Sequence, residues 1–83
     1  MVVKQLRPDL KRYLQKHNIT KKYLKQTKIF EDNPRHPSLN TEILEPRHLK
    51  IYSFRIDQKY RAVFIMTGHN EAEIVDINLH YQK

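Results

Sequence analysis

The side chains best suited to chemistry are two arginines and a histidine in the second half of the sequence. Arg55 and Arg61 lie on either side of Asp57-Gln58-Lys59, while His80 and Tyr81 follow the last apolar segment. Guanidinium groups bind phosphate oxygens in a forked geometry and stabilise negative charge that builds up at phosphorus. An imidazole can deliver a proton near neutral pH, and a tyrosine can donate a hydrogen bond or stack on a base. These residue types suit chemistry on a phosphate ester, provided that the fold brings them together.

A predicted β-hairpin places the two arginines side by side. Leu49–Ile56 and Tyr60–Met66 have strand character, and the three residues between them are typical of a hairpin loop. In the register that this loop sets, Arg55 lies directly opposite Arg61. Because side chains alternate between the two faces of a strand, the other face is apolar and is expected to lie under the helices. It comprises Tyr52, Phe54, Ile56, Tyr60, Ala62 and Phe64.

A last strand over Glu73–Leu79 completes the predicted meander, after a turn over Thr67–Ala72. Its more apolar set is expected to join the core and consists of Val75, Ile77 and Leu79. The face that carries the arginines then receives Ile74, Asp76, Asn78 and His80. This alternation brings His80 close to Arg61.

Like charges directly opposite each other destabilise a sheet. The arginine pair therefore persists where both side chains reach solvent or where an anion lies between them. Simpler pairings remain open, with Arg55 bound to Asp57, Arg61 bound to Asp76 and His80 an ordinary residue at the end of a strand. Register alone slightly favours these simpler pairings.

Two helices are predicted before the strands. Pro8 and Asp9 suit the first turn of a helix that ends near Asn18. Its helically spaced apolar residues are Leu6, Leu10, Tyr13, Leu14 and His17. A second helix is expected to have Thr20 as its N-cap, a staple between Ile19 and Leu24, and its end near Asn33-Pro34. Its predicted buried residues are Tyr23, Leu24, Thr27 and Phe30.

The remaining segments complete the predicted fold. Residues 33–48 contain three prolines and are expected to form an irregular crossing segment, with a short strand at about 40–44. Val2–Leu6 can open a further strand. Helices followed by a meander predict a single α+β domain over residues 1–83, with two N-terminal helices packed on one face of a twisted, mainly antiparallel sheet.

Composition excludes several functional classes. The 83 residues include no Cys, which excludes disulfide scaffolds, iron–sulfur ligation and thiol catalysis. No metal site is expected, because metal-ligand spacings are absent among His17, His36, His48 and His69. No apolar stretch suits a membrane span, and the N-terminus lacks the apolar core of a signal peptide. A soluble cytoplasmic protein without membrane contact is expected.

The net charge of +7 is concentrated in the first third of the chain. Residues 1–30 carry nine of the sixteen basic residues and one of the nine acidic residues. Such an excess is typical of a surface that binds a polyanion. The candidate contacts are Lys11, Arg12, Lys21, Lys22, Lys25 and Lys28. A solvated helix surface, an acidic protein partner or a membrane surface would fit the same excess.

The sequence resembles the RelE/ParE superfamily of bacterial toxin–antitoxin toxins, and in particular its YoeB-like members. The matching stretches are NPRHPSL at residues 33–39, YSFRID at 52–57, KYRAVF at 59–64, and the closing residues Ile77, His80 and Tyr81. The resemblance covers essentially the whole chain. It implies a small α+β domain with a twisted antiparallel sheet and helices ahead of the β-meander.

The RelE-like branch of this superfamily consists of metal-independent endoribonucleases, mostly acting on mRNA in the ribosomal decoding site. The resemblance implies that Arg55 and Arg61 engage the scissile phosphate and that Glu42 is the general base. It further implies that His80 or Tyr81 protonates the leaving group. The implied partners are mRNA, ribosomal RNA and a cognate antitoxin protein, with no cofactor. Two other functions stay open: poisoning of DNA gyrase, as in the ParE-like branch, and a catalytically degenerate module that only binds antitoxin or nucleic acid.

Overall fold

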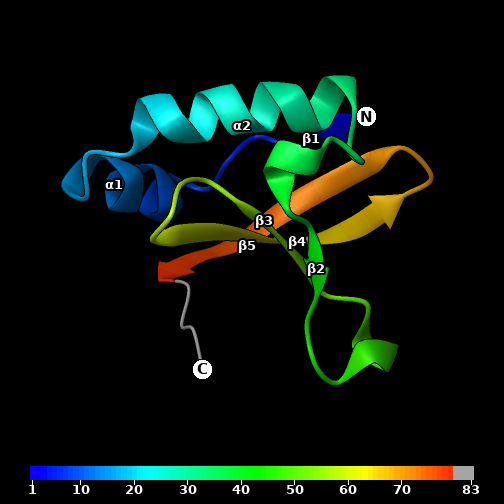
Figure 1. The fold of residues 1–83 in the computed structure, drawn as a ribbon. Coiled ribbons are helices and arrows are strands. Elements are labelled where there is room, and N and C mark those ends of the chain that lie inside the picture. Colours follow the sequence, from blue (N-terminus) through cyan, green and yellow to red (C-terminus); the bar gives the residue numbers. More distant parts are fainter. Residues whose placement is uncertain (80–83) are drawn as a thin grey trace.

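Within residues 1–79, two α-helices and two short helices pack with a five-stranded sheet (Figure 1). The computed structural model describes residues 1–79. The elements are β1 (Val2–Val3), α1 (Pro8–Lys16), α2 (Thr20–Asp32), the short helix η1 (Pro37–Leu39), β2 (Glu42–Ile43), the short helix η2 (Arg47–Leu49), β3 (Tyr52–Arg55), β4 (Tyr60–Gly68) and β5 (Glu71–Leu79). The sheet order is β1-β5-β4-β3-β2, with β1 parallel to β5 and the other neighbours antiparallel. The predicted α+β class is confirmed.

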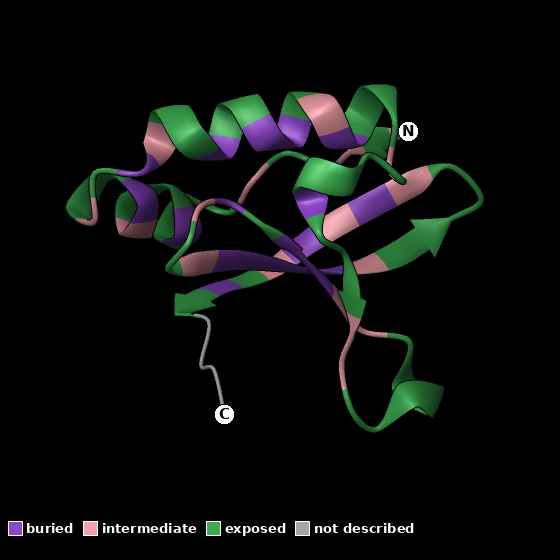
Figure 2. Cartoon of the chain, viewed as in Figure 1, coloured by how far each residue is buried: buried purple, intermediate pink, exposed green. Residues whose placement is uncertain are grey.

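The core fills the space between the two helices and one face of the sheet (Figures 1 and 2). Phe30 of α2 stacks on Phe54 of β3, with ring centroids 5.1 Å apart, and meets Phe64 of β4 edge-on at 4.9 Å. Leu39 of η1 is fully buried beside them. Burial of each such side chain contributes about 1.5–3 kcal/mol. The helix-facing side of the hairpin is therefore the apolar side that the sequence predicts.

The β3–β4 hairpin has the predicted register. Phe54 pairs with Ala62, and Arg55 pairs with Arg61 in the last pair before the loop. Asp57 closes the loop, because its Oδ1 accepts the backbone N–H groups of Lys59 and Tyr60, each at 2.8 Å. The predicted register of the two arginines is confirmed.

The first three residues of the predicted strand Leu49–Ile56 are not extended, because β3 begins only at Tyr52. Residues 47–49 form η2, and Lys50 has a left-handed backbone with φ of 55°, which interrupts extended pairing. Leu49 is exposed on this protruding loop. A hydrogen bond from the backbone N–H of Leu44 to the carbonyl of Ile51, at 2.8 Å, closes the loop. The crossing segment does contain the expected short strand, β2, which pairs with β3.

The predicted start and buried stripe of α2 need correction. Ile19, rather than Thr20, is the N-cap residue, and no side chain caps this end. Leu24 is 59% exposed, so the predicted staple does not bury it, and Gln26 is buried instead. The buried face consists of Tyr23, Gln26, Thr27 and Phe30, which follow the i, i+3, i+4, i+7 spacing of one helix face. Leu24 lies at the edge of that face despite its apolar side chain.

A β-bulge in β5 overturns part of the predicted alternation. Val63 pairs with Asp76 but Phe64 pairs with Ile74, which leaves Val75 as the extra residue. Because a bulge changes the face on which the residues beyond it lie, Ile74 and Ile77 are both buried. Strict alternation had placed Ile74 on the arginine face and Val75 in the core.

The end of β5 agrees with the prediction only in part. Leu79 was expected in the core, but it is 43% exposed at the strand end. Asn78 pairs with Arg61 and Asp76 with Val63, so both polar residues stay on the arginine face as predicted.

Candidate functional site

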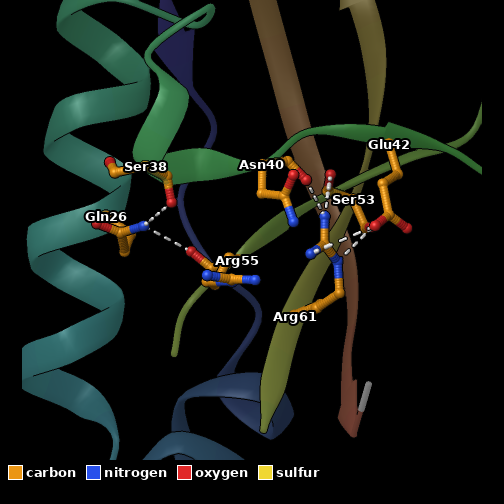
Figure 3. A network of polar contacts seen from close by, with 7 residues as sticks. All are labelled: Gln26, Ser38, Asn40, Glu42, Ser53, Arg55 and Arg61. Atoms are coloured by element: carbon orange, nitrogen blue, oxygen red, sulfur yellow. Dashed lines mark hydrogen bonds and ion pairs between the residues drawn. The ribbon is translucent and has the colours of Figure 1, made fainter. Parts of the chain in front are cut away.

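Arg61 lies at the centre of a polar network on the sheet face opposite the helices (Figure 3). Tyr60 and Ala62 on either side of it pack with the core, so the Arg61 side chain points the other way. Its Nε donates to the Oγ of Ser53 at 2.9 Å. Its Nη2 donates to the backbone carbonyls of Ser53, at 3.1 Å, and Asn40. The fold thus holds this guanidinium in one position.

One edge of the buried guanidinium is left without a hydrogen bond. Nη1 of Arg61 is buried and unpartnered, and the whole side chain is only 3% exposed. The Oε1 of Glu42 lies 3.9 Å from Nη1, which is beyond hydrogen-bond distance. Burial lowers the pKa of the Arg61 guanidinium, while the carboxylate of Glu42 acts to raise it. Arginine stays protonated in proteins, so this buried cation is a strong attractor for an anion.

Arg55 adds a second positive charge at the same place. It is exposed, lies opposite Arg61 in the hairpin and lowers the pKa of Arg61 further. Neither of the simpler pairings open from the sequence is present. Asp57 binds the Nζ of Lys22 at 3.2 Å, and Asp76 accepts a hydrogen bond from the Nδ2 of Asn78 at 3.1 Å. Both guanidiniums therefore keep some capacity for an outside anion.

A buried amide of α2 positions both sides of this network. The Nε2 of Gln26 donates to the backbone carbonyl of Arg55 at 2.8 Å and to that of Ser38 at 3.2 Å (Figure 3). The first carbonyl belongs to the end of β3, and the second lies two residues before Asn40. Gln26 therefore ties the crossing segment and the arginine-bearing hairpin to the same helix.

The network opens onto a hollow of about 250 Å³. Glu42 stands at its side because β2 pairs Glu42 with Ser53, next to the strand that carries Arg61. The side chain of Glu42 is 44% exposed, in contrast to Arg61. The lining residues are Glu42, Leu44, Ser53, Arg61, Val63, Asn78 and Leu79. In this hollow, the fixed guanidinium of Arg61 can attract an anion, and the exposed carboxylate of Glu42 can accept a proton.

The other residues singled out in the sequence are placed elsewhere. His80 and Tyr81 lie outside the described residues. The six candidate basic contacts are exposed on the helical layer, on the sheet side opposite Arg61. They are Lys11 and Arg12 on α1 and Lys21, Lys22, Lys25 and Lys28 on α2. The structure therefore places Glu42 and Arg61 in one hollow and Arg55 opposite Arg61 in the hairpin, but it leaves the six basic helix residues on the other side of the sheet.

No role was predicted from the sequence for three residues of the network. Ser53 was placed on the correct face but given no role, although its alternation with Tyr52 and Phe54 put it beside Arg61. Asn40 acts through its backbone carbonyl, so its side chain gives no signal. A polar Gln26 on the apolar face of a predicted helix was the one available clue to a buried hydrogen-bonding role.

Two further observations concern the part of the chain that the structure describes. Within residues 1–79, no group of three or more His, Asp or Glu side chains is arranged to hold a metal ion. No helix in the same range is both long and apolar enough to cross a membrane.

Comparison with known proteins identifies the fold. No family model matches the sequence, and no curated protein is significantly similar to it. The structure superposes on a YoeB/ParE toxin from Agrobacterium tumefaciens with a TM-score of 0.71, at 19% identity over 96% of both chains. Two structures of the YoeB–YefM complex from Staphylococcus aureus, one of them a heterotetramer, give TM-scores of 0.68 and 0.69 at 22% and 23% identity. Both cover 96% of this chain and 94% of theirs. The chain therefore has the fold of the YoeB/ParE toxins.

Proposed function

We propose that this protein is the toxin of a type II toxin–antitoxin pair and a metal-independent endoribonuclease that cuts mRNA on the ribosome. The observation that carries the proposal is Arg61, a buried cation with an unpartnered Nη1, in an open hollow that also holds the Glu42 carboxylate. The shared fold with YoeB/ParE toxins and the sequence resemblance both support it.

The proposed reaction begins when a ribose 2′-hydroxyl attacks the adjacent phosphorus atom. Glu42 takes the hydroxyl proton as the new P–O bond forms. Arg61, helped by Arg55, stabilises the added negative charge on the phosphoryl oxygens. The bond from phosphorus to the 5′ oxygen then breaks, and His80 or Tyr81 gives that oxygen a proton. The products are a 2′,3′-cyclic phosphate and a 5′-hydroxyl, and DNA is no substrate because it lacks the 2′-hydroxyl.

The observed geometry suits these roles. Nε and Nη2 of Arg61 are fixed by Ser53 and Asn40, so the guanidinium is held as a fixed positive charge beside the hollow. The exposed Glu42 side chain is free to approach a substrate hydroxyl. The nucleophile and the phosphate belong to one molecule, so correct positioning of the substrate supplies much of the rate enhancement.

The proposal includes two kinds of partner. A cognate antitoxin would keep the toxin silent, and two of the similar structures are toxin–antitoxin complexes. An antitoxin segment with acidic residues would complement the basic surface of the helices. Exposed helix lysines would bind ribosomal or messenger phosphates, in a manner that weakens steeply with salt.

One experiment tests this function against its rivals. The toxin is induced without an antitoxin, and mRNA under translation is mapped by primer extension. Discrete cuts that require translation support the ribonuclease. Growth arrest with double-strand DNA breaks and intact mRNA would establish gyrase poisoning instead. A folded protein that causes neither effect would be a binding module only.

A further inference from the structure

A second hollow, of about 460 Å³, lies at the end of the molecule where the α1–α2 connection meets the β3–β4 loop. Figure 1 shows both connections at the same end. Its lining includes His17, Asn18, Lys22, Gln58, Lys59 and Tyr60. This volume is in the range of pockets that hold small ligands. None of these side chains belongs to the network around Arg61.

One wall of this hollow is aromatic and held in place. The hydroxyl of Tyr60 forms a hydrogen bond with the Nδ1 of His17 at 3.0 Å, and the two ring centroids are 5.4 Å apart. Tyr13 supports His17 with a ring-centroid distance of 4.3 Å. Both wall residues remain half-buried, so they keep surface facing solvent. Fixed, partly exposed tyrosine and histidine rings are the platforms on which proteins stack unpaired bases.

Two lysines and one aspartate also line the hollow. Lys22 forms an ion pair with Asp57 at 3.2 Å, and Asp57 also accepts the two backbone N–H groups that close the hairpin loop. Lys59 is exposed, and within residues 1–79 no carboxylate pairs with it. The hollow therefore combines a net positive charge with an aromatic wall, and the amides of Asn18 and Gln58 lie beside it.

This second hollow lies at the loop end of the hairpin that carries the arginine pair. Tyr60 precedes Arg61 and Asp57 is two residues from Arg55, but the side chains of Tyr60 and Arg61 lie on opposite faces of the sheet. We propose that the hollow binds one nucleotide of a single-stranded RNA that passes around this end of the hairpin to the arginine face, with its base against Tyr60 and His17 and its phosphate near Lys59. This inference rests on the proposed ribonuclease function and names how its substrate would be held.

Binding can be measured without cleavage by placing every variant in a Glu42→Gln background. We expect AMP to shift the amide NMR resonances around His17, Lys22, Lys59 and Tyr60, whereas inorganic phosphate at the same concentration does not reproduce the shifts. Lys59→Gln and Tyr60→Leu should each weaken binding of a fluorescein-labelled RNA hexamer about five- to tenfold. Lys50→Gln, an exposed lysine after η2 that lies outside the hollow and outside the helices, should change it less than twofold.

The outcomes separate this inference from the proposed function. Equal shifts from phosphate and AMP, shifts outside the hollow, or unchanged RNA binding by Lys59→Gln and a folded Tyr60→Leu would overturn the nucleotide site. If these variants bind normally while the wild type still cuts mRNA, only this inference fails. If AMP occupies the hollow and the variants bind RNA weakly while the wild type cuts no RNA, the proposed chemistry fails and the nucleotide site stands.

Discussion

The Oε1 of Glu42 lies 3.9 Å from the Nη1 of Arg61, although the first side chain is 44% exposed and the second only 3%. The pair is thus asymmetric: the fold immobilises the cation and leaves the carboxylate able to move. A hydrogen-bonded ion pair would have neutralised both groups. The two groups instead form an ion pair without a hydrogen bond, so the Glu42 carboxylate can turn away from Arg61 toward the hollow.

Glu42→Gln should lower the rate of RNA cleavage about 10²–10⁴-fold, because the amide cannot accept a proton from the 2′-hydroxyl. The fold should be unaffected, since Glu42 is largely exposed and makes no short hydrogen bond. Single-turnover cleavage of a translated mRNA measures the loss, and circular dichroism checks the fold. Glu45→Gln, an exposed neighbour, is the matched control. Cleavage at the wild-type rate by Glu42→Gln would remove Glu42 from the mechanism.

Gln26→Leu should reduce both stability and cleavage. The variant leaves the carbonyls of Ser38 and Arg55 without the donor that joins them, at a cost of about 1–3 kcal/mol in the free energy of unfolding. Leu24→Ala on the same helix is the control, because Leu24 is exposed. Urea unfolding and cleavage assays report the two effects. A Gln26→Leu protein as stable and as active as wild type would show that this amide positions nothing.

The hairpin was predictable because a three-residue loop fixes the register and pleat alternation then fixes the faces. That argument placed Arg55 and Arg61 correctly without any knowledge of the helices. It failed at β5, because the bulge at Val75 is set by tertiary packing of Ile74 and Ile77 and leaves no local signal.

The burial of Arg61 was also beyond the sequence. Pleat alternation placed it on the uncovered face and implied an exposed side chain. Its burial depends on the carbonyl of Asn40, which the crossing segment just before β2 brings to Arg61 across a sequence separation of 21 residues. A contact made by a backbone carbonyl leaves no trace in the residue types.

The protein should lose stability at acid pH as Asp57 of the hairpin loop becomes protonated. Partial burial acts to raise the pKa of Asp57, but hydrogen bonds from the backbone N–H groups of Tyr60 and Lys59, with Lys22, lower it below its ordinary value. A lowered folded-state pKa stabilises the protein above the unfolded pKa of about 4, and this contribution is lost as the pH falls through the folded value.

Asp57→Asn tests this linkage. At pH 7 the variant should be about 1–2 kcal/mol less stable than wild type, because charge-assisted hydrogen bonds are weakened. The difference should shrink as the pH falls below about 4. Urea unfolding at several pH values measures it. A difference that stays constant from pH 7 to pH 3 would exclude a titration of Asp57 as the cause.

The basic residues of the helices should contribute to ribosome binding through phosphate contacts, and they should contribute little to the stability of the fold. Replacing a contacting lysine, for example Lys25→Gln, should reduce the slope of log K for ribosome binding against log salt concentration by about one. The free energy of unfolding should stay within about 0.5 kcal/mol of wild type. If replacement of each of Lys21, Lys25 and Lys28 leaves the salt slope unchanged, these side chains are solvent-exposed surface residues that make no phosphate contact.

The most direct test of the account is the cleavage rate of Arg61→Ala. The variant loses a donor to the phosphate in the transition state, which should lower the rate at least about 10²–10³-fold. It also removes the hydrogen bonds that Arg61 donates to the carbonyls of Ser53 and Asn40, so its fold must be verified by circular dichroism and urea unfolding. Arg61→Lys is the companion variant, since it keeps the charge but not the planar set of donors.

Primer extension on a translated mRNA, with equal amounts of folded wild type and Arg61→Ala, gives the result. Discrete 5′ ends are expected with wild type, none above background with Arg61→Ala, and at most weak cutting with Arg61→Lys. Cleavage by folded Arg61→Ala at the wild-type sites and rate would contradict the assignment of Arg61 and of the hollow around it.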